Sequence, residues 1–328
     1  MAALVTIGIP VYRCLDYLPQ TLESVRAQDY DNIEVIVSDN GINGPRLEEI
    51  VNRYYRKPFR LRKNPATVSP VAHFNQIIHE ASGEYFMMLH DDDLVSPNYV
   101  SELESLLASN SNVSVAISRQ ESMDKAGHFI RGSVENIPEM ISGRDFLREW
   151  SYYTYRFICH TSILARTSQL KMCGGYPDFP TGNSSDDALL IKLCLNNHVA
   201  YSPRCLFRKR EFESSLGYGC SYTELVKAET QFLQFLDADP WILEQARIRP
   251  ADWSETKKHI IRLIWETCFS RWRYMYRKRL PRMQWVLSAF AMPFIPDYYS
   301  AVIHTLVEMA LSRVKALLPR QGRPTAEL

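Results

Sequence analysis

The sequence lacks several features that would narrow its function at once. Its seven cysteines are odd in number and no two are spaced as Cys-x-x-Cys, so neither a disulfide framework nor a zinc ribbon is expected. This cysteine pattern favours a reducing compartment. No run of 18 uninterrupted apolar residues is present, so no clear transmembrane helix is expected. The apolar start of the chain has no cationic residues before it, which argues against a secretory signal peptide.

The common nucleotide and hydrolase motifs are also missing. The chain has no G-x-G-x-x-G or Walker A sequence for binding phosphates. It has no G-x-S-x-G elbow and no H-E-x-x-H metal motif either. Any catalytic function must therefore be argued from other residues, and the carboxylates are the strongest candidates.

Composition is that of an ordinary globular protein. The chain has 328 residues, of which 46% are hydrophobic and 23% are charged, and its length suggests about two domains. The formal net charge of +1 hides an asymmetry. Residues 251–328 hold 13 Lys and Arg against 6 Asp and Glu, whereas the remaining residues hold 25 against 31. The two parts are therefore predicted to meet different partners.

Short apolar runs alternate with helical periodicity over the first third of the chain. The helical patterns place apolar residues three and four positions apart. This alternation predicts an α/β protein with a parallel sheet and right-handed crossovers. The predicted strands are Leu4–Ile9, Ile33–Val37, Tyr85–Leu89 and Val113–Ile117, and the predicted helices are Leu15–Gln28, Val71–Ala81 and Asn98–Ser109.

The alternation of predicted strands and helices ends further along the chain. Residues 119–141 are predicted to form a hairpin or a long loop, and residues 173–185 a loop before a helix at 186–196. From residue 221 onward only helical patterns occur. A boundary near residues 215–220 divides the chain into a first domain, 1–217, and a helical, basic and aromatic region, 218–328.

Three carboxylates, Asp91, Asp92 and Asp93, directly follow one of the predicted strands. Ligands of open α/β sheets bind outside the carboxyl ends of strands, and Mg²⁺ often lies between carboxylates and substrate phosphates. A solvated acidic turn that caps the next helix is the alternative. Asp39 follows another strand and is either a ligand acceptor or a turn residue. Tyr12, two residues after Pro10, either stacks on a planar ring or covers the sheet edge.

Two more carboxylates, Asp186 and Asp187, open the helix predicted at 186–196. Acidic residues are favoured at helix N-termini because they complement the helix dipole. A general base at this position is the functional alternative.

Three segments of the chain together resemble family 2 glycosyltransferases, which have the GT-A fold. The opening, VTIGIPVYRCLDYLPQTLESVRAQDYDNIEVIVSDNG, resembles the start of that family. ASGEYFMMLHDDDLVSPNYV resembles its metal-binding acidic turn, and GGYPDFPTGNSSDDALLIKLCL resembles the segment that holds its catalytic base. The resemblance covers roughly Leu4 to Ser215 and implies a mixed, mainly parallel sheet flanked by helices. It also implies that residues 1–217 form a GT-A catalytic domain, in which a nucleotide-sugar half (about 1–118) precedes an acceptor half (about 119–217).

The resemblance also implies roles for single residues. Pro10 and Tyr12 match the nucleotide-binding end of the first strand, where the aromatic ring stacks on the base. Asp39 matches the acidic residue that hydrogen-bonds that base. The aspartate assigned as general base corresponds to Asp186.

In the acidic turn, Asp91 matches a residue near the ribose and phosphates. Asp92 matches the metal-binding aspartate, and Asp93 is assigned with it to the metal, Mn²⁺ or Mg²⁺. The sequence departs from the family pattern where His90 replaces a first carboxylate; His90 either ligates metal, bonds a phosphate or packs. Ser185 replaces a glutamate, which leaves the register between Asp186 and Asp187 open, and Ser38 stands where an aspartate is usual.

These residues lead to one main hypothesis and two alternatives. The main hypothesis is an inverting, metal-dependent glycosyltransferase that uses a nucleotide-diphosphate sugar, with a UDP sugar favoured, and a saccharide acceptor. A cation would neutralise the diphosphate leaving group, and a base would take the acceptor proton. A non-catalytic sugar-nucleotide or membrane-surface binding module on the same fold is one alternative. A metal-dependent phosphoryl-transfer enzyme is the other.

The C-terminal region combines basic and aromatic residues beside interrupted apolar segments. This combination predicts a helix lying in the interface of an anionic membrane, with a helical subdomain packed on the sheet as the alternative. Nucleic-acid binding is not expected, because no binding motif accompanies the charge. We therefore expect a cytoplasmic protein on the inner face of the cell membrane and a lipid-linked saccharide acceptor. The residues concerned are Arg271, Arg273, Arg277, Lys278, Arg279 and Arg282, with Trp265, Phe269, Trp272, Tyr274, Tyr276 and Trp285 among them.

Overall fold

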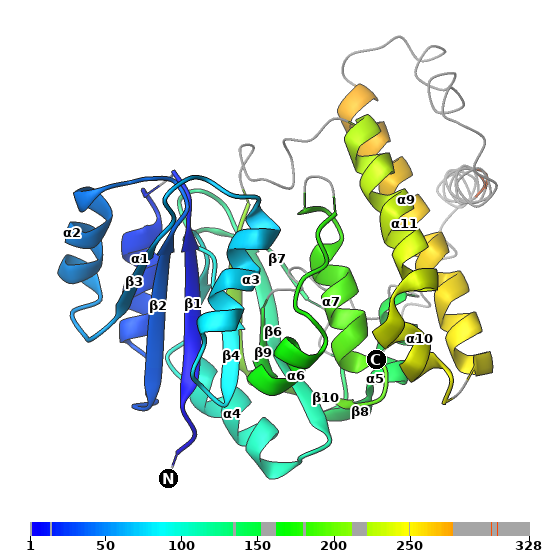
Figure 1. The fold of residues 1–328 in the computed structure, drawn as a ribbon, viewed down its shortest axis with the longest axis horizontal. Coiled ribbons are helices and arrows are strands. Elements are labelled where there is room, and N and C mark those ends of the chain that lie inside the picture. Colours follow the sequence, from blue (N-terminus) through cyan, green and yellow to red (C-terminus); the bar gives the residue numbers. More distant parts are fainter. Residues whose placement is uncertain are drawn as a thin grey trace, which may run out of the picture. The chain divides into compact units, whose positions relative to one another are not determined.

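The computed structural model describes residues 2–13, 15–133, 136–151, 162–179, 182–211, 222–248, 250–277, 303 and 307. The chain divides into two compact units, Met1–Lys257 and Lys258–Leu328. The first unit contains a mixed sheet with helices on both of its faces (Figure 1). Within the described residues, no helix is both long enough and apolar enough to cross a membrane.

The sheet has the strand order β3-β2-β1-β4-β9-β6-β10-β5, with β7 paired to β6 and β8 paired to β10. Strands β3, β2, β1 and β4 are parallel, β9 is antiparallel to both β4 and β6, and β10 is parallel to β6. The strands are β1 (Val5–Val11), β2 (Ile33–Asp39), β3 (Arg60–Lys63), β4 (Tyr85–Met88), β5 (Leu94–Val95), β6 (Val113–Met123), β7 (Phe129–Gly132), β8 (Met140–Ser142), β9 (Ile163–Arg166) and β10 (His198–Arg210).

Some of the helices begin at clear sequence signals. Ser69 caps α3 by accepting the Ala72 N–H at 3.1 Å, and a proline follows it at the first helical position. The helices are α1 (Leu18–Arg26), α2 (Pro45–Tyr54), α3 (Pro70–Glu80), α4 (Tyr99–Ser109), α5 (Gly143–Ser151), α6 (Thr167–Met172), α7 (Ser185–Cys194), α9 (Tyr222–Ala238), α10 (Pro240–Ala246) and α11 (Pro250–Arg277).

The four predicted strands are confirmed as β1, β2, β4 and β6, and residues 119–132 form the hairpin of β6 and β7. Strand β10 was not predicted from the sequence. It contains Pro203, and its register against β6 shifts between Ser202 and Leu206, so that Pro203, Arg204 and Cys205 lie outside the ladder. A proline and a break in alternation weaken the strand pattern that a sequence shows.

Strand β1 lies at the topological switch point of the sheet. The chain reaches β2 through α1 on one side of β1, and reaches β4 through α3 on the other. At such a point, open α/β sheets bind ligands outside the carboxyl ends of the strands, here those of β1 and β4. The polar residues predicted to bind nucleotide and metal follow these two strands and β2.

Helices α9 and α10 belong to the same compact unit as the sheet and pack against α7 and the loop before it. Phe179 makes edge-to-face contacts with Phe232 and Phe235 of α9, at ring-centroid distances of 5.9 and 5.4 Å. Lys192 of α7 forms a buried ion pair with Asp239 at 3.2 Å. The domain boundary predicted near residue 217 lies outside the described residues and stays a prediction.

Candidate active site

Topology brings the candidate residues to one edge of the sheet. Strands β4, β6 and β10 point in the same direction, because β9 runs antiparallel to both β4 and β6. Helix α7 precedes β10 through a short turn and runs in the opposite direction, so it begins at the carboxyl edge (Figure 1). Asp186 and Asp187, in the first turn of α7, therefore lie at the same edge as Tyr12 and Asp39.

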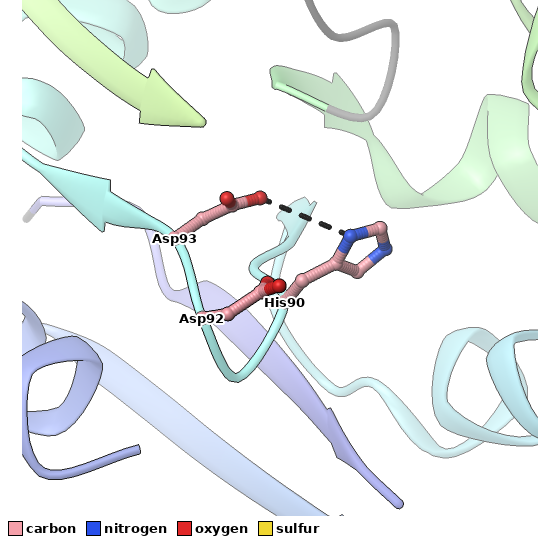
Figure 2. A group of neighbouring side chains, drawn as sticks. All are labelled: His90, Asp92 and Asp93. Carbon is pink, nitrogen blue, oxygen red and sulfur yellow. Dashed lines mark ion pairs between the residues drawn. The ribbon is translucent and has the colours of Figure 1, made fainter. Parts of the chain in front are cut away.

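The segment His90–Asp93, called the acidic turn from here on, links β4 to β5. The side chains of His90, Asp92 and Asp93 gather around one point, with their ligand atoms all within 4.8 Å of one another (Figure 2). His90 Nδ1 lies 3.8 Å from Asp93 Oδ2. Asp93 is only 2% exposed, and its other oxygen, Oδ1, accepts the backbone N–H of Arg210 at 2.9 Å.

His90 is both packed and placed at ligand distance. Its ring stacks on Phe74, with centroids 5.5 Å apart and planes 26° apart. Phe74 in turn contacts Tyr176 edge to face at 5.7 Å. The Nε2 atom of His90 is buried, and no hydrogen-bond partner for it is found among the described residues. Packing and metal ligation, which the sequence left as alternatives, are therefore compatible in this arrangement.

Burial and mutual repulsion set the protonation of the acidic turn. Burial, and then the charge of Asp92, raise the pKa of Asp91 to about 8. Burial raises the pKa of Asp92, and burial together with the Asp92 charge raises that of Asp93. Burial lowers the pKa of His90. A divalent cation would relieve this repulsion, and two carboxylates with an imidazole form a donor set that fits one.

The ends of β1 and β2, at the same sheet edge, present an aromatic ring beside a tight loop. Tyr12 is 42% exposed, and the Arg13 guanidinium carbon lies 5.0 Å from its ring centroid. The loop after β2 packs on the Tyr12 backbone so closely that a Cβ at Gly41 would lie 1.8 Å from the Tyr12 carbonyl oxygen. Asn43 ties the two together by donating its side-chain N–H to that oxygen.

Asp39 holds this loop in shape. Its carboxylate accepts the Gly41 N–H at 3.0 Å, the Asn43 N–H at 2.9 Å and the Asn43 side chain at 2.8 Å. The turn role that the sequence offered as an alternative is thus observed. A carboxylate has about four acceptor sites, so three hydrogen bonds leave capacity for a ligand. Pro10 of β1 pairs with Ser38 of β2 in the ladder between these two strands.

Sequence reasoning missed two residues at this edge. Ile42 has φ +58° and is 64% exposed, an unfavourable backbone conformation for a β-branched residue, of the kind that gathers at ligand sites. His73 of α3 is buried, and its Nε2 lies 2.7 Å from the Ser38 hydroxyl. Burial lowers the pKa of His73 to about 4, so the ring is neutral near pH 7. The loop sequence Asn-Gly-Ile-Asn was the only signal in the sequence that pointed to Ile42, and no signal pointed to His73.

The first turn of α7 is positioned from outside the sheet. Asp186 and Asp187 are both half-buried, and the Asp187 N–H donates to Asp186 Oδ1 at 3.1 Å. Ser184, the residue before the helix, has φ +60° and donates its hydroxyl to Glu229 of α9 at 2.7 Å. Both carboxylates occupy the same turn, so the register between Asp186 and Asp187 stays open.

Comparison with known proteins identifies related chains. Residues 6–171, about half of the chain, match the family model of Glycosyl transferase family 2. An uncharacterized glycosyltransferase of Rickettsia bellii is 34% identical over 130 residues, which are 39% of this chain and 18% of that protein. The putative glycosyltransferase EpsE of Bacillus subtilis is 25% identical over 180 residues, 52% of this chain and 59% of EpsE. The matches thus span less than two thirds of the length of these relatives.

Two solved structures have the same fold. S. aureus TarS 1–349, in complex with UDP-GlcNAc, superposes with a TM-score of 0.55 at 15% identity, covering 84% of this chain and 87% of TarS 1–349. The mannosyltransferase PcManGT from Pyrobaculum calidifontis, in complex with GDP-Man and Mn²⁺, gives a TM-score of 0.51 at 17% identity. The match covers 95% of this chain and 81% of the PcManGT chain. The predicted GT-A fold is confirmed by these neighbours.

Proposed function

Because this chain belongs to glycosyl transferase family 2, we propose that it is a metal-dependent, inverting glycosyltransferase. It moves a sugar from a nucleotide-diphosphate sugar to a hydroxyl group of a saccharide acceptor. The observation that supports this most strongly is the convergence at one sheet edge of Tyr12, Asp39, the acidic turn and the first turn of α7. A UDP sugar is the favoured donor, which TarS in complex with UDP-GlcNAc supports.

Each residue has a proposed role toward the donor. Tyr12 stacks on the base, Asp39 accepts a hydrogen bond from it, and Pro10 and Asp91 line the nucleotide site. Asp92 and Asp93 would hold Mn²⁺ or Mg²⁺, with His90 as a third candidate ligand. A cation bound there supplies positive charge beside the diphosphate, where negative charge develops as the donor bond breaks.

The acceptor side uses a carboxylate of α7. Asp186 takes the proton of the acceptor hydroxyl while the hydroxyl oxygen forms a bond to the anomeric carbon. The bond from that carbon to the diphosphate oxygen breaks, and the nucleoside diphosphate leaves with the electron pair. One displacement from the face opposite the leaving group inverts the configuration at the anomeric carbon.

Donor hydrolysis is the simplest test, because it needs no knowledge of the acceptor. The purified chain is incubated with a panel of UDP and GDP sugars, with and without Mn²⁺, and the released nucleotide is measured. We expect Mn²⁺-stimulated release that Asp92→Asn abolishes. The control is Asp31→Asn, an exposed aspartate before β2 at the opposite edge of the sheet, which should keep wild-type activity. Donor binding without any turnover would support the binding module instead.

We also propose a lipid-linked saccharide as the acceptor and peripheral association with the inner face of the cell membrane. The basic and aromatic residues between 265 and 285 support this proposal. Most of their side chains lie outside the described residues. The test is co-sedimentation with anionic liposomes at low and high salt. Failure of the full chain to sediment at low salt would contradict it, as would unchanged binding after deletion of residues beyond Ala251.

A further inference from the structure

Arg210, the last residue of β10, ends directly against the acidic turn. Strand β10 reaches this point because it pairs with β5 just beyond the turn, Phe207 with Val95 and Arg208 with Leu94. Arg210 is only 2% exposed, which is rare for an arginine. A buried guanidinium next to a candidate cation site calls for an explanation.

The contacts of Arg210 include both residues assigned to the metal. Its backbone N–H donates to Asp93 Oδ1 at 2.9 Å, and its Nε donates to the carbonyl oxygen of Asp92 at 3.0 Å. Nη1 donates to the carbonyl oxygens of Asp124 and Lys125, at 3.2 and 2.9 Å, in the turn of the β6–β7 hairpin. One side chain thus connects the acidic turn to that hairpin.

Helix α1 completes the surroundings of the guanidinium. Nη2 donates to Gln20 Oε1 at 2.7 Å, and the guanidinium carbon lies 4.4 Å from the centroid of the Tyr17 ring. These side-chain partners are neutral, although a buried charge is costly unless opposite charge compensates it. The Arg210 charge acts on Asp92 of the acidic turn, where it partly offsets the rise in pKa that burial causes.

The consequence for the cation site is geometric. With Asp93 Oδ1 bound to the Arg210 N–H, the second oxygen, Oδ2, is the one that faces His90. With the Asp92 carbonyl bound to Nε, the backbone that carries the Asp92 side chain is fixed as well. Lysine at position 210 would keep the charge, but it lacks the planar fork that reaches several carbonyl oxygens at once.

We propose that Arg210 is a positioning residue that sets the geometry of the acidic turn for its divalent cation. It does not contact the cation itself. This proposal rests on the proposed function, in which Asp92 and Asp93 hold Mn²⁺ or Mg²⁺. It predicts that loss of the Arg210 fork weakens cation binding and raises the donor KM, while turnover recovers at saturating Mn²⁺.

The chain offers a close control in Arg166, at the end of β9. Its guanidinium also donates to three backbone carbonyl oxygens, those of Leu107, Asn110 and Val113, and lies 5.5 Å from the ring centroid of Tyr85. Arg166 also lies 3.8 Å from the Glu84 carboxylate, an ion pair that Arg210 lacks among its described partners, and none of these contacts is with the acidic turn. Comparing Arg210→Lys with Arg166→Lys separates positioning of the turn from general stabilisation.

In the experiment, Mn²⁺ is titrated into the full chain with UDP present, and its binding is monitored by electron paramagnetic resonance. Melting temperatures are measured in parallel. Arg210→Lys should weaken Mn²⁺ binding about tenfold or more, the scale known for residues that orient metal ligands, while Arg166→Lys binds as wild type. Gln20→Ala, at an exposed residue that folding tolerates, should weaken binding in the same direction by less.

The positioning role would be overturned if Gln20→Ala bound Mn²⁺ as tightly as the wild type and Arg210→Lys, provided that it folds, did so too. Equal weakening in Arg210→Lys and Arg166→Lys would overturn it too. If the wild-type chain binds no Mn²⁺ with UDP present, the metal-dependent function fails, and the positioning role fails with it. Normal Mn²⁺-dependent turnover with an unaffected Arg210→Lys variant would remove the positioning role alone.

Discussion

The two sides of the candidate site are supported in different ways. The acidic turn is held by elements of the sheet and its adjoining helices, through Arg210 of β10 and Phe74 of α3. The first turn of α7 depends on a helix that follows the sheet in sequence, through the hydrogen bond from Ser184 to Glu229. The proposed donor side is therefore built into the sheet, whereas the proposed acceptor side depends on α9 to position its candidate base.

This difference gives the helices after β10 a place in the catalytic unit. Lys192 and Asp239 form a buried ion pair, and the Trp241 indole N–H donates to the Lys192 carbonyl oxygen at 3.1 Å. Breaking a buried ion pair costs several kcal/mol because an uncompensated charge is left behind. We therefore expect changes in α9 to affect the acceptor step and to leave donor binding intact.

The largest expected effect on the acceptor side is at the base itself. Asp186→Asn removes the group that accepts the proton and should lower kcat about 100-fold or more, with donor binding unchanged. The measurements are turnover kinetics and calorimetric binding of the donor. If Asp186→Asn is nearly wild type and Asp187→Asn is inactive, the base is Asp187.

A smaller effect is expected at the α9 contact. Glu229→Leu removes the acceptor for the Ser184 hydroxyl, so the first turn of α7 shifts and kcat falls about tenfold, with donor KM unchanged. Glu229→Gln keeps an acceptor oxygen and should retain most activity. The control is Asp237→Asn, an exposed residue of the same helix that pairs with Lys257. A rise in donor KM in Glu229→Leu would contradict the division between the two sides.

The last effect concerns acid stability and is not expected in turnover. Because burial lowers the pKa of His73 to about 4, the unfolded chain binds a proton that the folded chain does not between about pH 6.5 and pH 4. The free energy of unfolding should therefore fall as pH falls through this window, by at most about 3 kcal/mol from this residue. Urea unfolding at pH 7, 6 and 5 measures the loss, which should be smaller in His73→Gln. An identical pH dependence in the two proteins would exclude this role of His73.

The sequence reveals the carboxylates of the acidic turn but not the residue that holds them, for a physical reason. Asp91, Asp92 and Asp93 are adjacent to one another and to an apolar strand, so a local pattern reveals them. Arg210 contacts Asp93 across 117 positions of sequence, and nothing near Arg210 indicates that partner.

The support of α7 was hidden for the same reason. Ser184 and Glu229 are 45 residues apart and meet only because α9 folds back onto α7. Helix α9 was predicted as the start of a separate region, since helical periodicity shows an apolar face but not what covers it. The basic and aromatic segment near Arg282 stays a prediction, because it lies outside the described residues.

The central claim is that the acidic turn binds a divalent cation together with the diphosphate of the donor. Isothermal titration of Mn²⁺ into the full chain, with and without UDP, tests it most directly. Phosphate oxygens complete the coordination shell, so Mn²⁺ should bind more tightly with UDP present, and Asp92→Asn should remove this gain. Equal Mn²⁺ affinity with and without UDP, or an unchanged gain in Asp92→Asn, would contradict the claim.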